Sequence, residues 1–76
     1  MRKAAEAYRR ALELDPAMAE AHYGLGYALL QTGDLDGSAA ELEAALSSAP
    51  PDAPWRRDAE DALVLVHLRK AQPAPK

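Results

Sequence analysis

Cysteine is absent from this sequence of 76 residues, and only two histidines occur, His22 and His67, far apart along the chain. Without cysteine no disulfide framework can form, and two distant histidines cannot make a zinc finger, so we predict no metal site. A chain without cysteine suits a reducing compartment, and we expect a cytoplasmic protein. A single domain this small buries only roughly 60–65% of its unfolded surface, so its stability should be marginal.

Long apolar runs and an excess of positive charge are missing as well. No run approaches the roughly 18 apolar residues of a membrane span, and the first residues lack the apolar stretch of a secretory signal. The net charge is −3, from 12 acidic and 9 basic residues. Because binding to a phosphate backbone requires clustered Lys and Arg, we expect neither nucleic acid nor a membrane as a partner.

Residue patterns that carry catalysis or cofactor binding are also lacking. The serines at 47–48 have no nearby base, and Glu41 and Glu43 lie on different faces of an expected helix. The Gly-Leu-Gly at 24–26 follows no strand and precedes no Lys-Ser or Lys-Thr, unlike a nucleotide-binding loop. The Asp-Leu-Asp-Gly at 34–37 lacks the later ligands of a calcium loop. The sequence therefore predicts no enzyme activity and no cofactor.

Proline and glycine divide the chain into segments, because proline disfavours helix in the residue before it. Apolar residues recur every three to four positions in each segment, and no segment alternates with period two. Gly33 suits the left-handed end of a helix, Asp34 can cap the next helix, and Pro54 suits a first helical turn. The predicted helices are 2–14, 18–31, 35–48 and 54–70, and a disordered proline-rich tail is expected over 71–76.

Part of the sequence recurs after 34 residues, since Ala-Leu-x-x-x-Pro occurs at 11–16 and again at 45–50. Such a period is typical of stacked helical hairpins. Two helices approach to about 8–10 Å only where the side chains at their crossing are small. The small residues expected at these crossings are Ala4, Ala11, Gly26, Ser38 and Ala45.

This pattern resembles the tetratricopeptide repeat. Residues 19–50 carry the Leu-Gly pair of that family at 25–26, its Gly-Asp turn at 33–34 and its Ala-Leu-x-x-x-Pro ending. The resemblance implies an all-α fold in which antiparallel helix-turn-helix repeats stack as a short right-handed α-solenoid of four helices. His22 occupies the position where the family usually has Trp, and we expect it to pack between helices rather than act as a general base.

The resemblance covers residues 2–70 as one full repeat flanked by two half repeats. Residues 2–16 match only the second half of a repeat, and residues 53–70 resemble a first-half helix without the Gly-Asp turn. Because solenoids usually need about three repeats, we expect either a fragment of a longer array or a homodimer. The apolar patch Leu63–Leu68 either serves such pairing or is buried at the end of the array.

In the resembled family, the first helices of successive repeats line a concave groove that binds peptides. Tyr23 and Tyr27 stand i, i+4 on such a helix and combine apolar area with a hydroxyl group, although both rings could instead pack inside the protein. Arg57 is expected one repeat after Tyr23, where it would hold a ligand carboxylate or stack on the ring. By this resemblance the peptide-binding residues are Glu20, Tyr23, Tyr27, Leu30, Gln31, Arg57 and Asp61.

Some members of the family clamp the C-terminal carboxylate of a peptide with Lys and Asn residues on this face. Here those places hold Tyr23, Gly24 and Tyr27, so we expect no such ligand. The sequence thus predicts a protein–protein interaction module for a protein or peptide partner that it does not identify. The alternative is an accessory or oligomerisation domain of a larger protein, such as an enzyme whose catalytic part lies elsewhere.

Overall fold

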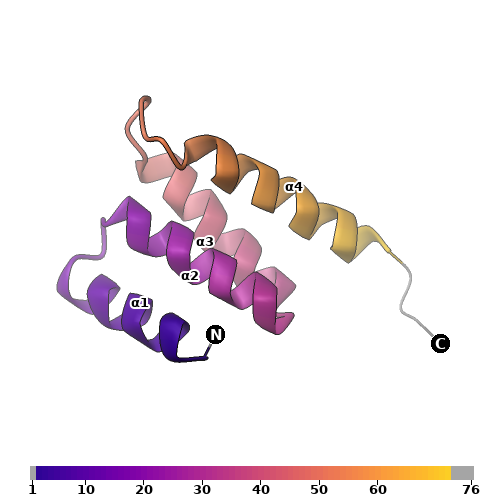
Figure 1. The fold of residues 1–76 in the computed structure, drawn as a ribbon, viewed down its shortest axis with the longest axis horizontal. Coiled ribbons are helices and arrows are strands. Elements are labelled where there is room, and N and C mark those ends of the chain that lie inside the picture. Colours follow the sequence, from indigo (N-terminus) through magenta and orange to yellow (C-terminus); the bar gives the residue numbers. More distant parts are fainter. Residues whose placement is uncertain (1, 73–76) are drawn as a thin grey trace.

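Four α-helices account for most of residues 2–72, the part of the chain that this computed structural model describes (Figure 1). Each helix packs against the next one along the chain, and consecutive helices run in opposite directions. The described residues contain no strand, and the predicted all-α repeat fold is confirmed. None of these helices is long and apolar enough to cross a membrane. The helices are α1 (Arg2–Leu14), α2 (Ala19–Thr32), α3 (Leu35–Ser48) and α4 (Arg56–Ala71).

The helix α4 begins two residues later than the sequence predicts, whereas the other three begin within one residue of their expected starts. The amide of Arg56 donates to the carbonyl of Ala53 at 3.1 Å, so Pro54 lies in a turn before the helix and not in its first turn. The predicted tail overlaps α4, whose last residue is Ala71. Residues 73–76 of that tail lie outside the described part of the chain.

The turn between α2 and α3 is formed by the residues that the sequence indicates. Gly33 has a φ of 90°, a left-handed conformation that glycine adopts without steric cost. The amide of Asp34 donates to the Leu29 carbonyl at 2.9 Å, which satisfies one of the last carbonyls of α2. The Asp34 carboxylate in turn accepts from the Gly37 amide at 3.0 Å and caps α3. This short turn therefore places α3 directly against α2.

The helices α2 and α3 approach each other closely at Gly26. A Cβ atom at this position would lie 2.8 Å from Leu42 Cγ and 3.2 Å from the Leu42 backbone nitrogen, so only glycine fits without a shift. The hydroxyl of Ser38 donates to the Gly26 carbonyl at 2.7 Å, and Ser38 is fully buried. Small residues thus let the two backbones approach, and a buried hydrogen bond fixes their register.

Two groups of buried residues form the core, and α2 contributes to both of them. The group between α1 and α2 contains Ala5, Leu25, Ala28 and Leu29. To this group α1 contributes one buried alanine, Ala5, and the half-buried Ala4 and Leu12. The larger group, which joins α2, α3 and α4, contains Leu30, Ala39, Leu42, Ala59, Ala62 and Val66.

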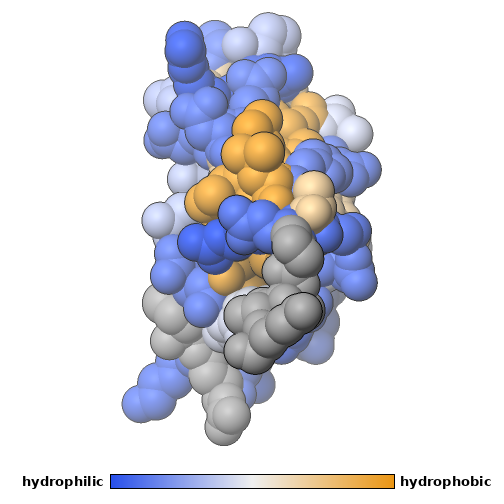
Figure 2. All heavy atoms as spheres, turned by 90° about the vertical axis from the view of Figure 1, so that its right-hand side faces the viewer, coloured by the Kyte–Doolittle hydropathy of each residue, from blue (hydrophilic) through white to orange (hydrophobic). Residues whose placement is uncertain are grey.

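The side of α4 away from this core is apolar and exposed. Val64, Leu65 and Leu68 expose 57%, 40% and 59% of their surface, whereas Val66 is fully buried. Figure 2 shows apolar atoms gathered on the side of the molecule where α4 ends. The predicted patch at 63–68 is therefore divided: one part is core and another part is open.

Polar contacts at both ends of α4 attach it to α3. One guanidinium nitrogen of Arg56 lies 3.4 Å from the carbonyl oxygens of Leu46 and Ala49, where α3 ends. A cation there also interacts favourably with the dipole of α3. At the other end, Lys70 Nζ lies 2.6 Å from Asp36 Oδ1, and this hydrogen bond and charge lower the pKa of Asp36.

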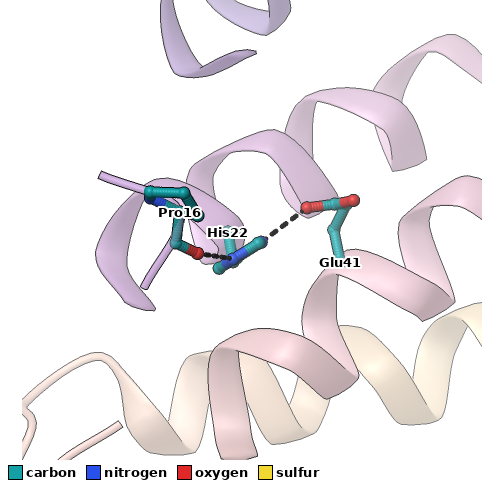
Figure 3. Close-up of polar contacts among 3 residues, drawn as sticks. All are labelled: Pro16, His22 and Glu41. Carbon is teal, nitrogen blue, oxygen red and sulfur yellow. Dashed lines mark hydrogen bonds and ion pairs between the residues drawn. The ribbon is translucent and has the colours of Figure 1, made fainter. Parts of the chain in front are cut away.

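A second link between α2 and α3 is made by His22. Its Nε2 lies 2.9 Å from the Pro16 carbonyl oxygen, and its Nδ1 lies 2.7 Å from Glu41 Oε1 (Figure 3). Burial lowers the pKa of His22, but the hydrogen bonds to Glu41 and Pro16 and the charge of Glu41 together raise it above 6.5. Both acceptors are satisfied best by the protonated ring, since only that form donates from both nitrogens. His22 therefore packs between helices, as expected, and its ring makes two hydrogen bonds there.

Replacing Gly26 with alanine should destabilise the fold by about 1–3 kcal/mol, because the added methyl group collides with Leu42, including its backbone. Gly24→Ala is the matched control. There the three atoms nearest to the added methyl all belong to the ring of Tyr8, a side chain at the surface that can swing away. Urea denaturation followed by circular dichroism measures both variants. A Gly26→Ala chain at least as stable as Gly24→Ala would contradict the close crossing.

Stability should also depend on pH through His22. Its pKa is raised in the folded state, so the stabilisation is fully present below about pH 6.5, the unfolded value, and is lost as the pH rises through the higher folded value. We expect the stability difference between the native chain and His22→Gln to shrink by about 1 kcal/mol or less over this rise. Urea denaturation in a series of buffers of different pH measures this difference in stability. Any contribution of His67 cancels in the difference, because both chains contain it. A difference that grows with pH would refute the assignment.

Candidate functional site

A groove of about 390 Å³ lies between α2 and α4. These two helices run in the same direction and are brought together by α3, against which both pack. Apolar, aromatic and charged side chains of both helices line the groove. Its lining consists of Tyr23, Tyr27, Leu30 and Gln31 from α2, and of Asp58, Asp61, Ala62, Leu65 and Arg69 from α4.

The groove changes its chemical character from one end to the other. The lining residues of each helix follow one another at helical spacing, so they lie along one face of it. Because α2 and α4 are parallel, the first lining residues of α2 lie beside the first lining residues of α4. Tyr23 and Asp58 therefore occupy one end, and Leu30, Leu65 and Arg69 occupy the other. One end is aromatic and acidic, while the other is apolar and carries a cation.

Tyr23 is held in place by another aromatic residue. Its ring stacks on Trp55, with centroids 5.2 Å apart and an angle of 13° between the planes. Burial raises the pKa of the Tyr23 hydroxyl, and the negative charge of Asp58 raises it further. Tyr23 thus stays neutral well above physiological pH and keeps a hydroxyl that can both donate and accept.

Tyr27 is the more accessible of the two groove tyrosines. Its ring centroid lies 6.5 Å from that of Tyr23, at a tilt of 56°, and 44% of its surface is exposed. The alternative expectation, that the tyrosines pack inside the protein, holds in part for Tyr23, because its ring stacks on Trp55. Tyr27, in contrast, presents apolar area and a hydroxyl group to solvent.

A second hollow, of about 380 Å³, adjoins the groove on the side of α1. Tyr23 lines both hollows and forms part of the wall between them. The ring of Tyr8 lies against Gly24, at a place that any larger residue would fill. The residues that line this hollow are Tyr8, Ala11, Met18, Glu20, Ala21, Tyr23, Gly24 and Trp55.

The structure brings five of the seven predicted site residues to the groove: Tyr23, Tyr27, Leu30, Gln31 and Asp61. Leu30 is only 3% exposed, so it forms part of the floor. Glu20 lines the adjoining hollow instead. Arg57 lines neither, and the side chain that stacks on Tyr23 is that of Trp55.

The displaced position of Arg57 follows from helix geometry. Consecutive residues of a helix point about 100° apart, and in α4 it is Asp58, one residue later, that faces the groove. A stripe beginning at Asp58 continues through Asp61, Leu65 and Arg69, at steps of three or four. That spacing was a usable signal in the sequence, but counting 34 residues on from Tyr23 leads to Arg57.

The described residues hold no cluster of side chains of the kind that binds a metal ion. No group of three or more acidic or histidine side chains within 2–72 is close enough to hold a metal ion. Both ring nitrogens of His22 are engaged, one with Pro16 and the other with Glu41. The groove lining instead combines one exposed aromatic ring, that of Tyr27, with charged groups of both signs.

A family model described as tetratricopeptide repeat matches residues 2–54, which include α1, α2, α3 and the loop that follows. The match ends before α4, the helix that supplies one wall of the groove. No curated protein and no solved structure matches the chain. Because the matched segment covers well over half of the 76 residues and the fold is a stack of antiparallel helices, the chain belongs to the tetratricopeptide repeat family.

Proposed function

We propose that this protein is a non-catalytic scaffold that binds a segment of a protein or peptide partner in the groove between α2 and α4. Tetratricopeptide repeats are in general modules for protein–protein interaction, which supports the broad assignment. The placement of the partner in the groove between α2 and α4 goes beyond that broad assignment.

The observation that carries the proposal is the exposed ring of Tyr27 in the middle of the groove. An exposed tyrosine loses little conformational entropy on binding and combines a large apolar area with a hydroxyl group, which makes it a frequent anchor in interfaces. Its neighbour Tyr23 is already held by Trp55, so this part of the surface is preorganised. The groove is shallow and open, and we therefore expect affinities in the micromolar range of about 1–100 μM.

A second candidate function is favoured by the exposed side of α4. Val64, Leu65 and Leu68 form an apolar surface of the kind that oligomerisation domains bury. Light scattering on the isolated chain distinguishes the two functions. A folded monomer that binds peptides supports the scaffold, whereas a dimer that Leu68→Asp converts to monomer supports oligomerisation.

Tyr27→Ala should weaken binding by about tenfold or more, because it removes the exposed anchor. The probe is a peptide selected on the native chain from a phage-displayed library of random dodecapeptides. Binding is followed by the fluorescence of Trp55, the only tryptophan of the chain, and by calorimetry. Helicity by circular dichroism should remain unchanged.

Leu14→Ala is the matched control, because Leu14 is 85% exposed and lines neither hollow. We expect it to bind the same peptide as the native chain does. Loss of helicity together with binding in Tyr27→Ala would mean that Tyr27 is a core residue. Unchanged binding would place the peptide elsewhere on the molecule.

A further inference from the structure

We propose that the groove selects a partner segment with a Lys or Arg at one end, followed by apolar residues, and binds it in one direction. The cation lies beside Tyr27, Asp58 and Asp61, and the apolar residues lie along Leu30 and Leu65. This inference rests on the proposed function and adds to it the chemistry and orientation of the partner.

The charges that line the groove are arranged to attract a cation at one end. Asp58 and Asp61 lie in the first half of α4, whereas the single basic lining residue, Arg69, lies near its end. Neither aspartate takes part in the ion pairs or side-chain hydrogen bonds found among the described residues. Their carboxylates are therefore free to pair with a partner's cation.

The aromatic rings add to this preference. A cation is attracted to the face of a tyrosine ring, and the attraction grows when the ring is partly shielded from water. Tyr27 and Tyr23 line the same groove as the two aspartates, and the charge of Asp58 already acts on the Tyr23 hydroxyl. Carboxylates and aromatic rings thus converge on one place, which an anionic partner group would avoid.

The length of the groove sets the spacing of the partner's residues. Asp58 and Arg69 are eleven positions apart (69 − 58 = 11), which corresponds to about 16 Å along a helix. An extended peptide covers that distance in about five residues. Arg69 repels a second cation at its end, so we expect a neutral or acidic residue there. The partner segment therefore begins with a cationic residue, continues with apolar residues, and has a neutral or acidic residue about five positions from the cation.

The test begins with the same library of random dodecapeptides, selected on the native chain and sequenced. We expect enrichment of Lys or Arg next to an apolar stretch. The most enriched peptide is then titrated against Asp58→Asn/Asp61→Asn, with Trp55 fluorescence as the readout. Loss of two favourable charges should weaken binding by about tenfold, and the native interaction should weaken as salt rises.

The matched control is Glu43→Gln/Asp52→Asn, which removes two negative charges that are exposed but line no part of the groove. We expect its affinity to stay within about twofold of the native value, because exposed charges at a distance are screened. Arg69→Gln tests the direction of binding. It should lower the affinity for a selected peptide whose far end is acidic and leave it unchanged for one whose far end is neutral, whereas a marked rise would mean that the peptide's cation lies beside Arg69 and that the peptide binds in the reverse direction.

Asp58 lies in the first turn of α4, where a negative charge favours the helix, so helicity is checked for every variant. Asp61→Asn alone, which leaves that turn intact, provides the readout if the double variant unfolds. Enrichment of acidic or uncharged peptides would overturn the inference, and so would equal weakening by the groove and control variants. In both cases the proposed function would stand as long as Tyr27→Ala still weakens binding of the selected peptide. If no peptide is selected, or if selected peptides ignore Tyr27→Ala, the proposed function itself fails.

Discussion

The close approach of α2 and α3 at Gly26 is the contact on which the rest of the structure depends. Glycine there leaves room for Leu42, and the Ser38 hydroxyl closes the gap with a buried hydrogen bond of 2.7 Å to the Gly26 carbonyl. A core this small gains little from area alone. Tight contact between two backbones therefore contributes specificity that a few large side chains cannot supply, because it permits one register and one crossing.

The groove is a consequence of that crossing. α3 carries α4 through the larger core group and through Arg56 and Lys70 at its two ends. Because α3 is fixed on α2, α4 comes to lie beside α2 and parallel to it. Two helices that are far apart in sequence thus supply the two walls of one groove, and the stack between Tyr23 and Trp55 joins α2 to the residue just before α4. The proposed binding surface therefore arises from the stacking of helices, as in other repeat architectures.

The sequence predicted the features that depend on interactions between residues close together in the chain. Gly33 and Asp34 predicted the turn because φ preference and capping act within a few residues. On α4, Asp61 lines the groove but Arg57 does not, and Asp58 lies there instead, because a count of 34 residues from Tyr23 does not fix how α4 is rotated about its axis. The hydrogen bonds of His22 could not be predicted from the sequence, because they depend on where the fold places Pro16 and Glu41.

The register of α2 against α3 is tested most directly by nuclear magnetic resonance of the native chain. We expect strong nuclear Overhauser effects between the Hα protons of Gly26 and the methyl groups of Leu42, whose Cγ lies 2.8 Å from the place that a Cβ of residue 26 would take. We also expect effects between Gly26 and the Hβ protons of Ser38. Sequential contacts of one unbroken helix from Ala19 to Ser48, without these cross-peaks, would contradict the crossing and the groove that depends on it.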